Sequence, residues 1–234
     1  MSTELSIQND LGMSLAEAIG VSSSGQTKSA SLPRINLIHN SIMGTMEVAG
    51  KNIKTEVVPA GAYKVTLGED KEVYAINPSV RIFAVRQQWS KWDSEANNML
   101  KTVMSTDLKG DLKDNMGGFN LGRPSGYIDD WDAVPQKTKD LIRSIKRKKI
   151  VFGMMTADEV KDAEGNELDA ITEPTPFVYE VSPSSIKALD QAMTSLTRKN
   201  ILPIQYTFTL GADEGTLPNG NTYAIMTLGA GDKV

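Results

Sequence analysis

The sequence predicts a mainly β protein with a few helices. Short apolar stretches with the alternation of strands recur between residues 32 and 90, separated by Gly, Pro and Asn. One clear helical pattern lies in the C-terminal half, and two further alternating stretches follow it. Many short strands at this spacing are typical of a small barrel or sandwich. A chain of 234 residues with 40% apolar side chains is long enough for one large domain with a sizeable core.

Residues 1–31 are predicted to form a flexible N-terminal arm, and residues 32–234 a single domain. The arm contains the polar run SSSGQTKSAS, which has the composition of a linker. It lacks a basic start followed by an apolar block, so a signal peptide is not expected. No long apolar run occurs in the chain, and no membrane partner is therefore expected. The absence of Cys fits a reducing compartment.

The first predicted strands lie between residues 32 and 71. Ile35 and Leu37 alternate with polar neighbours, which is the period of a half-buried strand. Pro59 confines its segment to an edge or a turn, because proline has no amide hydrogen to donate. The expected elements are a strand at 32–39, a hairpin at 46–54 that turns at 49–52, a strand at 57–65 and a turn at 68–71.

Residues 72–92 are predicted to be one strand that leaves the core and ends on a binding surface. The stretch begins apolar and β-branched, and it ends with Arg86, Trp89, Lys91 and Trp92. Bases stack on aromatic faces, and cations neutralise phosphates. This end of the strand is therefore a candidate nucleic-acid contact. The alternative is an amphipathic strand whose tryptophans cover the edge of a β core.

A Gly-rich loop at 115–127 is the second candidate contact, after a helix expected at 94–104. The loop carries Phe119, Arg123 and Tyr127. Glycine lets a backbone approach a ligand closely, and aromatic side chains beside arginine suit stacking on bases. The alternative is a surface loop whose aromatic side chains fold back onto the β domain.

The densest positive charge follows a short helix predicted at 136–145. It consists of Lys146, Arg147, Lys148 and Lys149, which lead directly into a β-branched strand. Such a segment places cations at the rim of a sheet, where they could contact phosphates. The alternative is a solvated helix end whose cations complement the helix dipole.

The C-terminal third completes the predicted fold. The expected elements are a turn at 163–166, a strand at 174–181, a helix that begins at Pro183 after Ser182 as N-cap, and a closing hairpin formed by 204–210 and 222–228. The helix carries an apolar stripe with a period of 3.6 residues, made up of Ile186, Leu189, Met193 and Leu196.

Catalytic chemistry is not expected, and no cofactor or metal is predicted. His39 is the only histidine and lacks a recognisable nucleophile motif. No phosphate-binding GxxxxGK[ST] sequence occurs. Two groups of aspartates could hold Mg²⁺, although such groups more often lie in solvated turns; they are Asp107, Asp111 and Asp114, and Asp129, Asp130 and Asp132. The net charge of −4 means that any nucleic-acid contact depends on a local basic patch.

Together, these segments and their order resemble the single-stranded-DNA-binding proteins of tailed phages. The resemblance implies an elaborated OB-fold barrel, a role in replication and recombination, and a location in the host cytoplasm. It assigns base stacking to Trp89, Trp92, Phe119 and Tyr127, and phosphate contact to Arg86, Lys91, Arg123, Lys146, Arg147, Lys148 and Lys149. Such proteins commonly end in an acidic tail that recruits replication proteins. Here the last seven residues contain only one acid, Asp232, which leaves that recruitment in question.

Two other classes of function stay open. The first is a phage virion structural protein, such as a capsid decoration or tail component, which fits many strands and the absence of catalytic groups. It predicts a homo-oligomer without a preference for single strands. The second is an enzyme that acts on nucleic acid through a metal held by aspartates.

Overall fold

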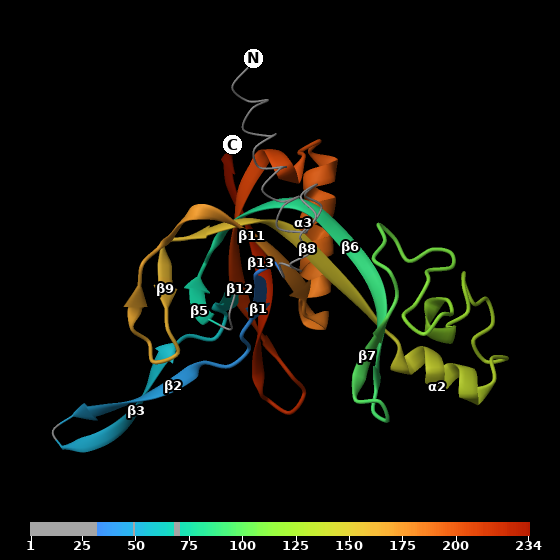
Figure 1. Cartoon of the computed structure of the whole chain (residues 1–234), viewed down its shortest axis with the longest axis horizontal. Helices are drawn as coiled ribbons and strands as arrows, with labels where there is room; N and C mark the ends of the chain where they lie inside the picture. The colour runs from blue at the N-terminus through green and yellow to red at the C-terminus, as the bar shows by residue number, and fades with distance from the viewer. Residues whose placement is uncertain (1–31, 49, 68–70) are drawn as a thin grey trace, which may run out of the picture. The chain divides into compact units, whose positions relative to one another are not determined.

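The computed structural model of the protein describes residues 32–48, 50–67 and 71–234. The described chain is mainly β, as predicted, with two α-helices in the part that is described, α2 (Gln136–Ser144) and α3 (Ile186–Arg198) (Figure 1). Short 3-10 turns are η1 (Asn120–Gly122), η2 (Pro183–Ser185) and η3 (Pro203–Gln205). The predicted arm at 1–31 and residues 68–70 of the predicted turn lie outside the described residues.

Eleven strands form one mixed sheet. They are β1 (Arg34–Leu37), β4 (Tyr63–Leu67), β5 (Lys71–Ile76), β6 (Ser79–Asp93), β7 (Asn98–Lys101), β8 (Lys146–Ala157), β9 (Glu159–Lys161), β10 (Glu167–Leu168), β11 (Ile171–Val181), β12 (Tyr206–Thr216) and β13 (Thr222–Lys233). Their order is β10-β9-β5-β4-β1-β11-β8-β6-β12-β13, and β7 pairs with β6 off this path. β1 pairs parallel with β11 and antiparallel with β4. The path is open, with β10 and β13 at its two ends.

The described residues form two compact units where the sequence predicts one domain. The first unit comprises the described residues up to Phe83, together with Phe152–Tyr179 and Ser184–Val234. The second unit comprises Ala84–Val151 and Glu180–Pro183. Both β6 and β8 therefore have residues in each unit.

The core of the first unit is built from alternating strand residues and aromatic pairs. Ile35 and Leu37 are buried while their neighbours in β1 are exposed, as predicted. The rings of Tyr63 and Tyr179 meet edge to face at 5.9 Å between centroids. The hydroxyl of Tyr63 donates to the carbonyl oxygen of Gly211 at 2.8 Å. Burial, with a smaller contribution from Tyr179, raises the pKa of Tyr63 far above its ordinary value. This tyrosine is therefore a neutral core residue.

Several predicted elements are confirmed. The hairpin near 46–54 is formed by β2 (Ile42–Val48) and β3 (Lys51–Val58), which pair antiparallel. Helix α2 lies where a short helix is expected, and β9 and β10 pair on either side of the turn at 163–166. The closing hairpin is formed by β12 and β13 and is longer than predicted. Helix α3 packs against β13.

Two predicted strands are wrong because a proline-containing turn interrupts each. The stretch 72–92 divides at Asn77 and Pro78 into β5 and β6, with Asn77 at a left-handed φ of 47°. The segment 57–65 divides at Pro59, whose carbonyl accepts the amide of Ala62. Proline cannot donate to a ladder, so strand pairing is interrupted at each of these positions before the next strand begins.

Two helix predictions also differ from the structure. Residues 94–104 are not helical: the carboxylate of Asp93 accepts the amides of Glu95 and Ala96, Asn97 has a φ of 50°, and β7 follows. An aspartate that bonds the following amides favours a turn over a helix. The later helix starts with η2, and α3 begins at Ile186, so Ser182 is not its N-cap.

Gly153 in β8 provides a test of the strand packing in the first unit. A Cβ atom at Gly153 would lie 2.1 Å from the backbone oxygen of Arg81, so Gly153→Ala requires the backbone to move. We expect the free energy of unfolding to fall by about 2–3 kcal/mol in urea denaturation. The control is Gly229→Ala, whose new Cβ would lie 3.6 Å from its nearest neighbour, Thr209. Equal stability of the two variants would contradict this packing.

Candidate nucleic-acid interface

A small antiparallel sheet in the second unit positions the candidate side chains. The end of β6 pairs with β7, where Trp92 lies opposite Met99 and Ser90 opposite Lys101. Two further segments of the chain join this sheet through isolated antiparallel bridges. One bridge pairs Thr102 with Asp114, and the other pairs Lys113 with Phe119. Directly opposite residues in antiparallel strands point their side chains to the same face. These pairings therefore define which side chains share a face.

One face of this sheet is exposed, and we call it the open face. Met99, Lys101 and Val103 are exposed, whereas Leu100 and Thr102 between them are buried. The alternation follows the two-residue period of a strand. Carried across the bridges, it assigns six exposed residues to the open face: Trp92, Met99, Lys101, Val103, Lys113 and Phe119. Ser90, opposite Lys101, lies on the same side of the sheet but is buried and donates to the carbonyl oxygen of Lys146 at 3.4 Å. Trp92 and Phe119 are 53% and 51% exposed, so both rings offer large apolar surfaces to solvent.

The opposite face of the sheet covers a small core. Trp89 packs, with Leu141, against the buried side chains of Leu100, Leu121 and Ile145. The guanidinium carbon of Arg123 lies 4.6 Å from the centroid of the Trp89 ring, which is cation–π geometry. Trp89 and Arg123 therefore contact each other and the core. The structure places them apart from the open face, although the sequence analysis grouped them with Trp92.

The loop that presents Phe119 is held by polar side chains. The carboxylate of Asp114 accepts the amides of Met116, Gly118 and Leu121 at 3.0, 2.9 and 2.9 Å. The side chain of buried Asn120 accepts the amide of Leu112 and donates to the carbonyl of Gly110, each at 3.0 Å. These bonds hold Asn120 and Leu121 at left-handed φ values of 54° and 56°. Non-glycine residues remain in this region only where the surroundings enforce it.

Four of the six aspartates considered as metal ligands, Asp107, Asp111, Asp114 and Asp130, accept hydrogen bonds within the chain. Asp107 accepts the amide of Lys109, and Asp130 accepts the amides of Asp132 and Ala133. Asp111 accepts bonds from Asn120 and Ser125. Within the described chain, no group of three or more metal-ligating side chains has the geometry to hold an ion.

The predicted basic cluster is divided by increasing burial along β8. Lys146 and Arg147 are exposed, and the Lys146 ammonium donates to the carbonyl of Arg143 at 2.8 Å. Lys148 forms an ion pair with Glu180. Lys149 is only 8% exposed. The four cations therefore do not present one continuous exposed surface, because exposure falls along the strand from Lys146 and Arg147 to the buried Lys149.

The remaining predicted contacts have different environments. Arg86 is half-buried and donates to the carbonyl of its neighbour Val85. Lys91 is half-buried and lies opposite Leu100, on the core side of the sheet. Tyr127 is 89% exposed in the loop that follows η1. Of the eleven predicted contact residues, the structure brings only Trp92 and Phe119 together on the open face.

Four residues of the open face were missed by the sequence analysis: Met99, Lys101, Val103 and Lys113. The signal was present in the alternation of Met99 to Val103. It was hidden because the same residues were interpreted as the end of a helix. Lys113 pairs with Phe119 across a tight loop, and no pattern in the neighbouring sequence predicts this pairing.

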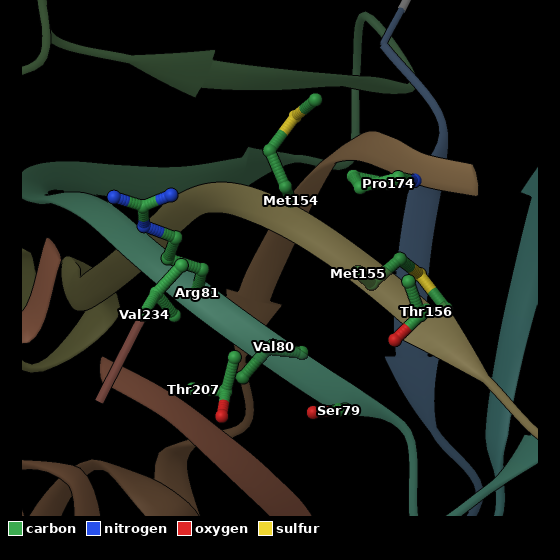
Figure 2. A pocket seen from close by; sticks show the side chains of 9 residues that line it. All are labelled: Ser79, Val80, Arg81, Met154, Met155, Thr156, Pro174, Thr207 and Val234. Carbon is green, nitrogen blue, oxygen red and sulfur yellow. The ribbon is translucent and has the colours of Figure 1, made fainter. Parts of the chain in front are cut away.

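A hollow in the first unit is a weaker candidate site. It has a volume of about 120 Å³ and is lined by Ser79, Val80, Arg81, Met154, Met155, Thr156, Pro174, Thr207 and Val234 (Figure 2). Clefts that hold drug-sized ligands are larger, roughly 300–1,000 Å³. Arg81 is the one charged side chain among these lining residues, and its guanidinium already donates to the carbonyl of Ile204. The lining offers no pair of groups for acid–base or nucleophilic chemistry.

Comparisons with protein-family models, with curated proteins and with solved structures give no match to this chain. The resemblance to phage single-strand-binding proteins therefore stays a prediction. Among the described residues, no helix is long and apolar enough to span a membrane. The candidate function consequently depends on the geometry of the open face.

Because Trp89 and Trp92 lie on opposite faces of the sheet, we expect their replacement to have different effects on the stability of the protein. Trp89→Ala removes part of a core, so we expect the free energy of unfolding to fall by about 2–4 kcal/mol. Trp92→Ala removes an exposed ring, and we expect a change within about 0.5 kcal/mol. Urea denaturation followed by far-ultraviolet circular dichroism measures both. Equal losses in the two variants would contradict the assignment of the rings to opposite faces.

Proposed function

We propose that the protein binds single-stranded DNA without strong sequence preference through the open face of its second unit. The observation that carries the proposal is the juxtaposition of two half-exposed aromatic rings, Trp92 and Phe119, with the exposed cations Lys101 and Lys113. Aromatic platforms stack bases of any identity, and cations beside them neutralise the backbone. None of the six open-face residues is acidic, so the local charge is favourable although the chain carries −4.

An unpaired strand fits this surface better than a duplex does. Stacking requires access to the flat face of a base, and a duplex covers these faces with neighbouring base pairs. Trp92 lies in β6 and Phe119 lies at an isolated bridge, and the exposed apolar side chains of Met99 and Val103 lie on the segment of the face between them. This arrangement offers a continuous platform for successive bases, flanked by two phosphate contacts.

The proposal also includes three more specific predictions made from the sequence. These are an OB-like architecture, a role in phage replication or recombination, and a location in the host cytoplasm. The support for them is the order of segments that resembles phage single-strand-binding proteins. The open path of the described sheet does not by itself add to that support. Lys146 and Arg147 are further exposed cations of the same unit that could extend the phosphate contacts.

The alternative is a virion structural protein, and one feature bears on it. The hairpin β2–β3 exposes apolar side chains and forms a sheet of its own, as a surface for self-association would. Sedimentation with and without single-stranded DNA separates the two functions. Particle-like assemblies without affinity for DNA would favour the structural role.

The aromatic platform predicts a specific fluorescence response. Binding of oligo-dT should quench the tryptophan emission, and Trp92→Phe should remove most of this quenching. Trp131→Phe is the matched control, because Trp131 lies outside the open face and should leave the quenching intact. Phe119→Ala should weaken binding about tenfold, since a stacked base contributes roughly 1–3 kcal/mol. Unchanged affinity in both Trp92→Ala and Phe119→Ala would exclude this platform.

The lysines predict a change in the salt dependence of binding. Each phosphate contact to a single strand contributes about 0.7 to the slope of log K against log salt concentration. Lys101→Gln together with Lys113→Gln should therefore reduce the slope by about 1.4. The control pair is Lys187→Gln with Lys199→Gln, which removes the same charge from exposed positions in and just after α3. An equal change of slope in the control pair would mean that only net charge matters.

A further inference from the structure

The hollow in the first unit reaches from the surface to the core. Three of its lining side chains, Val80, Met154 and Met155, are almost fully buried. Pro174 and Val234 add further apolar surface (Figure 2). Every lining residue belongs to the first unit, so this site is independent of the open face.

The volume of the hollow sets the size of the group that it can hold. Its volume of about 120 Å³ is slightly below the roughly 150 Å³ of an apolar protein cavity that binds benzene. A hydrocarbon group of about five carbons therefore fits the hollow. Burial of a polar group against such a lining is unfavourable unless the group finds a hydrogen-bond partner.

Arg81 supplies such a partner at the hollow. Its Nε donates to the carbonyl oxygen of Ile204, and its guanidinium carbon lies 5.8 Å from the centroid of the Phe83 ring. These contacts orient the guanidinium, while its two Nη nitrogens have no partner among the described residues. In Figure 2 the guanidinium stands at the edge of the group of lining side chains. A guanidinium fork of this kind matches the two oxygens of a carboxylate.

We propose that this hollow binds a small aliphatic carboxylate, with the hydrocarbon tail inside the hollow and the carboxylate on Arg81. None of the lining residues is acidic, so the only charge among them is positive. A phosphate ion would leave the apolar lining uncovered, and a plain hydrocarbon would leave the Nη groups without an acceptor. A ligand with a short tail and one carboxylate uses both parts of the site.

Two sources present this chemistry. One is a free short-chain acid, and the other is the last residue of a peptide that ends in leucine, whose side chain lies beside the terminal carboxylate. Capture of a chain end through its carboxylate is a recurring mode of peptide recognition. The experiment therefore compares the two sources directly.

Saturation-transfer NMR on the ligands, with the full-length protein, tests the proposal. The two probes are isocaproate, as the free acid, and acetyl-Gly-Gly-Leu, as the chain end. We expect a dissociation constant of about 1 mM for at least one of them, as suits so small a ligand. Isocaproamide keeps the tail without the charge, and acetate keeps the charge without the tail. Each should bind about tenfold more weakly than isocaproate if the free acid is the ligand.

Two variants separate the roles of the cation and the hollow. Arg81→Gln should weaken the binding of the carboxylate probe about tenfold and leave the weak binding of isocaproamide unchanged. Ser79→Leu should fill the hollow and abolish the binding of both compounds; the Ser79 hydroxyl has no hydrogen-bond partner among the described residues, so none is lost. The matched control is Arg198→Gln, which removes one exposed arginine from α3 in the same unit and should leave the affinity unchanged. Circular dichroism checks that each variant is folded.

The result also identifies the source of the ligand. Binding of isocaproate alone assigns the site to free acids, and binding of the peptide alone assigns it to chain ends. The proposal is overturned if neither probe binds at about 10 mM, ten times the expected constant. It is also overturned if isocaproamide binds as tightly as isocaproate, or if Ser79→Leu leaves the binding intact. None of these outcomes bears on DNA binding by the open face, which is measured separately.

Discussion

Side chains along a β-strand alternate between the two faces of its sheet, and this constraint decides the arrangement of the second unit. Trp89 and Trp92 are three residues apart in β6, so they point to opposite faces. Trp89 lies on the core side, where Arg123 covers its ring. Trp92 lies on the exposed side, across from Met99. A single strand thereby supplies both a core residue and a candidate base-stacking residue.

The exposed side of this sheet depends on polar groups beneath it. Asp114 and Asn120 satisfy backbone amides of the loop around Phe119, and so hold an aromatic ring on a segment that has no regular strand. The carboxylate of Asp114 is also one of those considered from the sequence as a possible Mg²⁺ ligand. Its hydrogen bonds to three amides give it a structural role that requires no ion. A rigid loop of this kind reduces the ordering entropy that a ligand would otherwise have to offset. The open face combines aromatic rings with two lysines and no acidic side chain, which suits a polyanion with flat bases.

The sequence by itself determined the elements whose signals are local. The alternation about Ile35, the hairpin at 46–54 and the short helix before Lys146 follow from residue period and turn chemistry, and the structure contains all of them. Only the tertiary structure decided which aromatic and basic side chains share a surface. That result depends on strand register between residues far apart in sequence, such as Lys113 with Phe119, and on breaks such as the one at Pro78. Register is set by pairing partners and burial, so a list of residue types along the chain does not contain it.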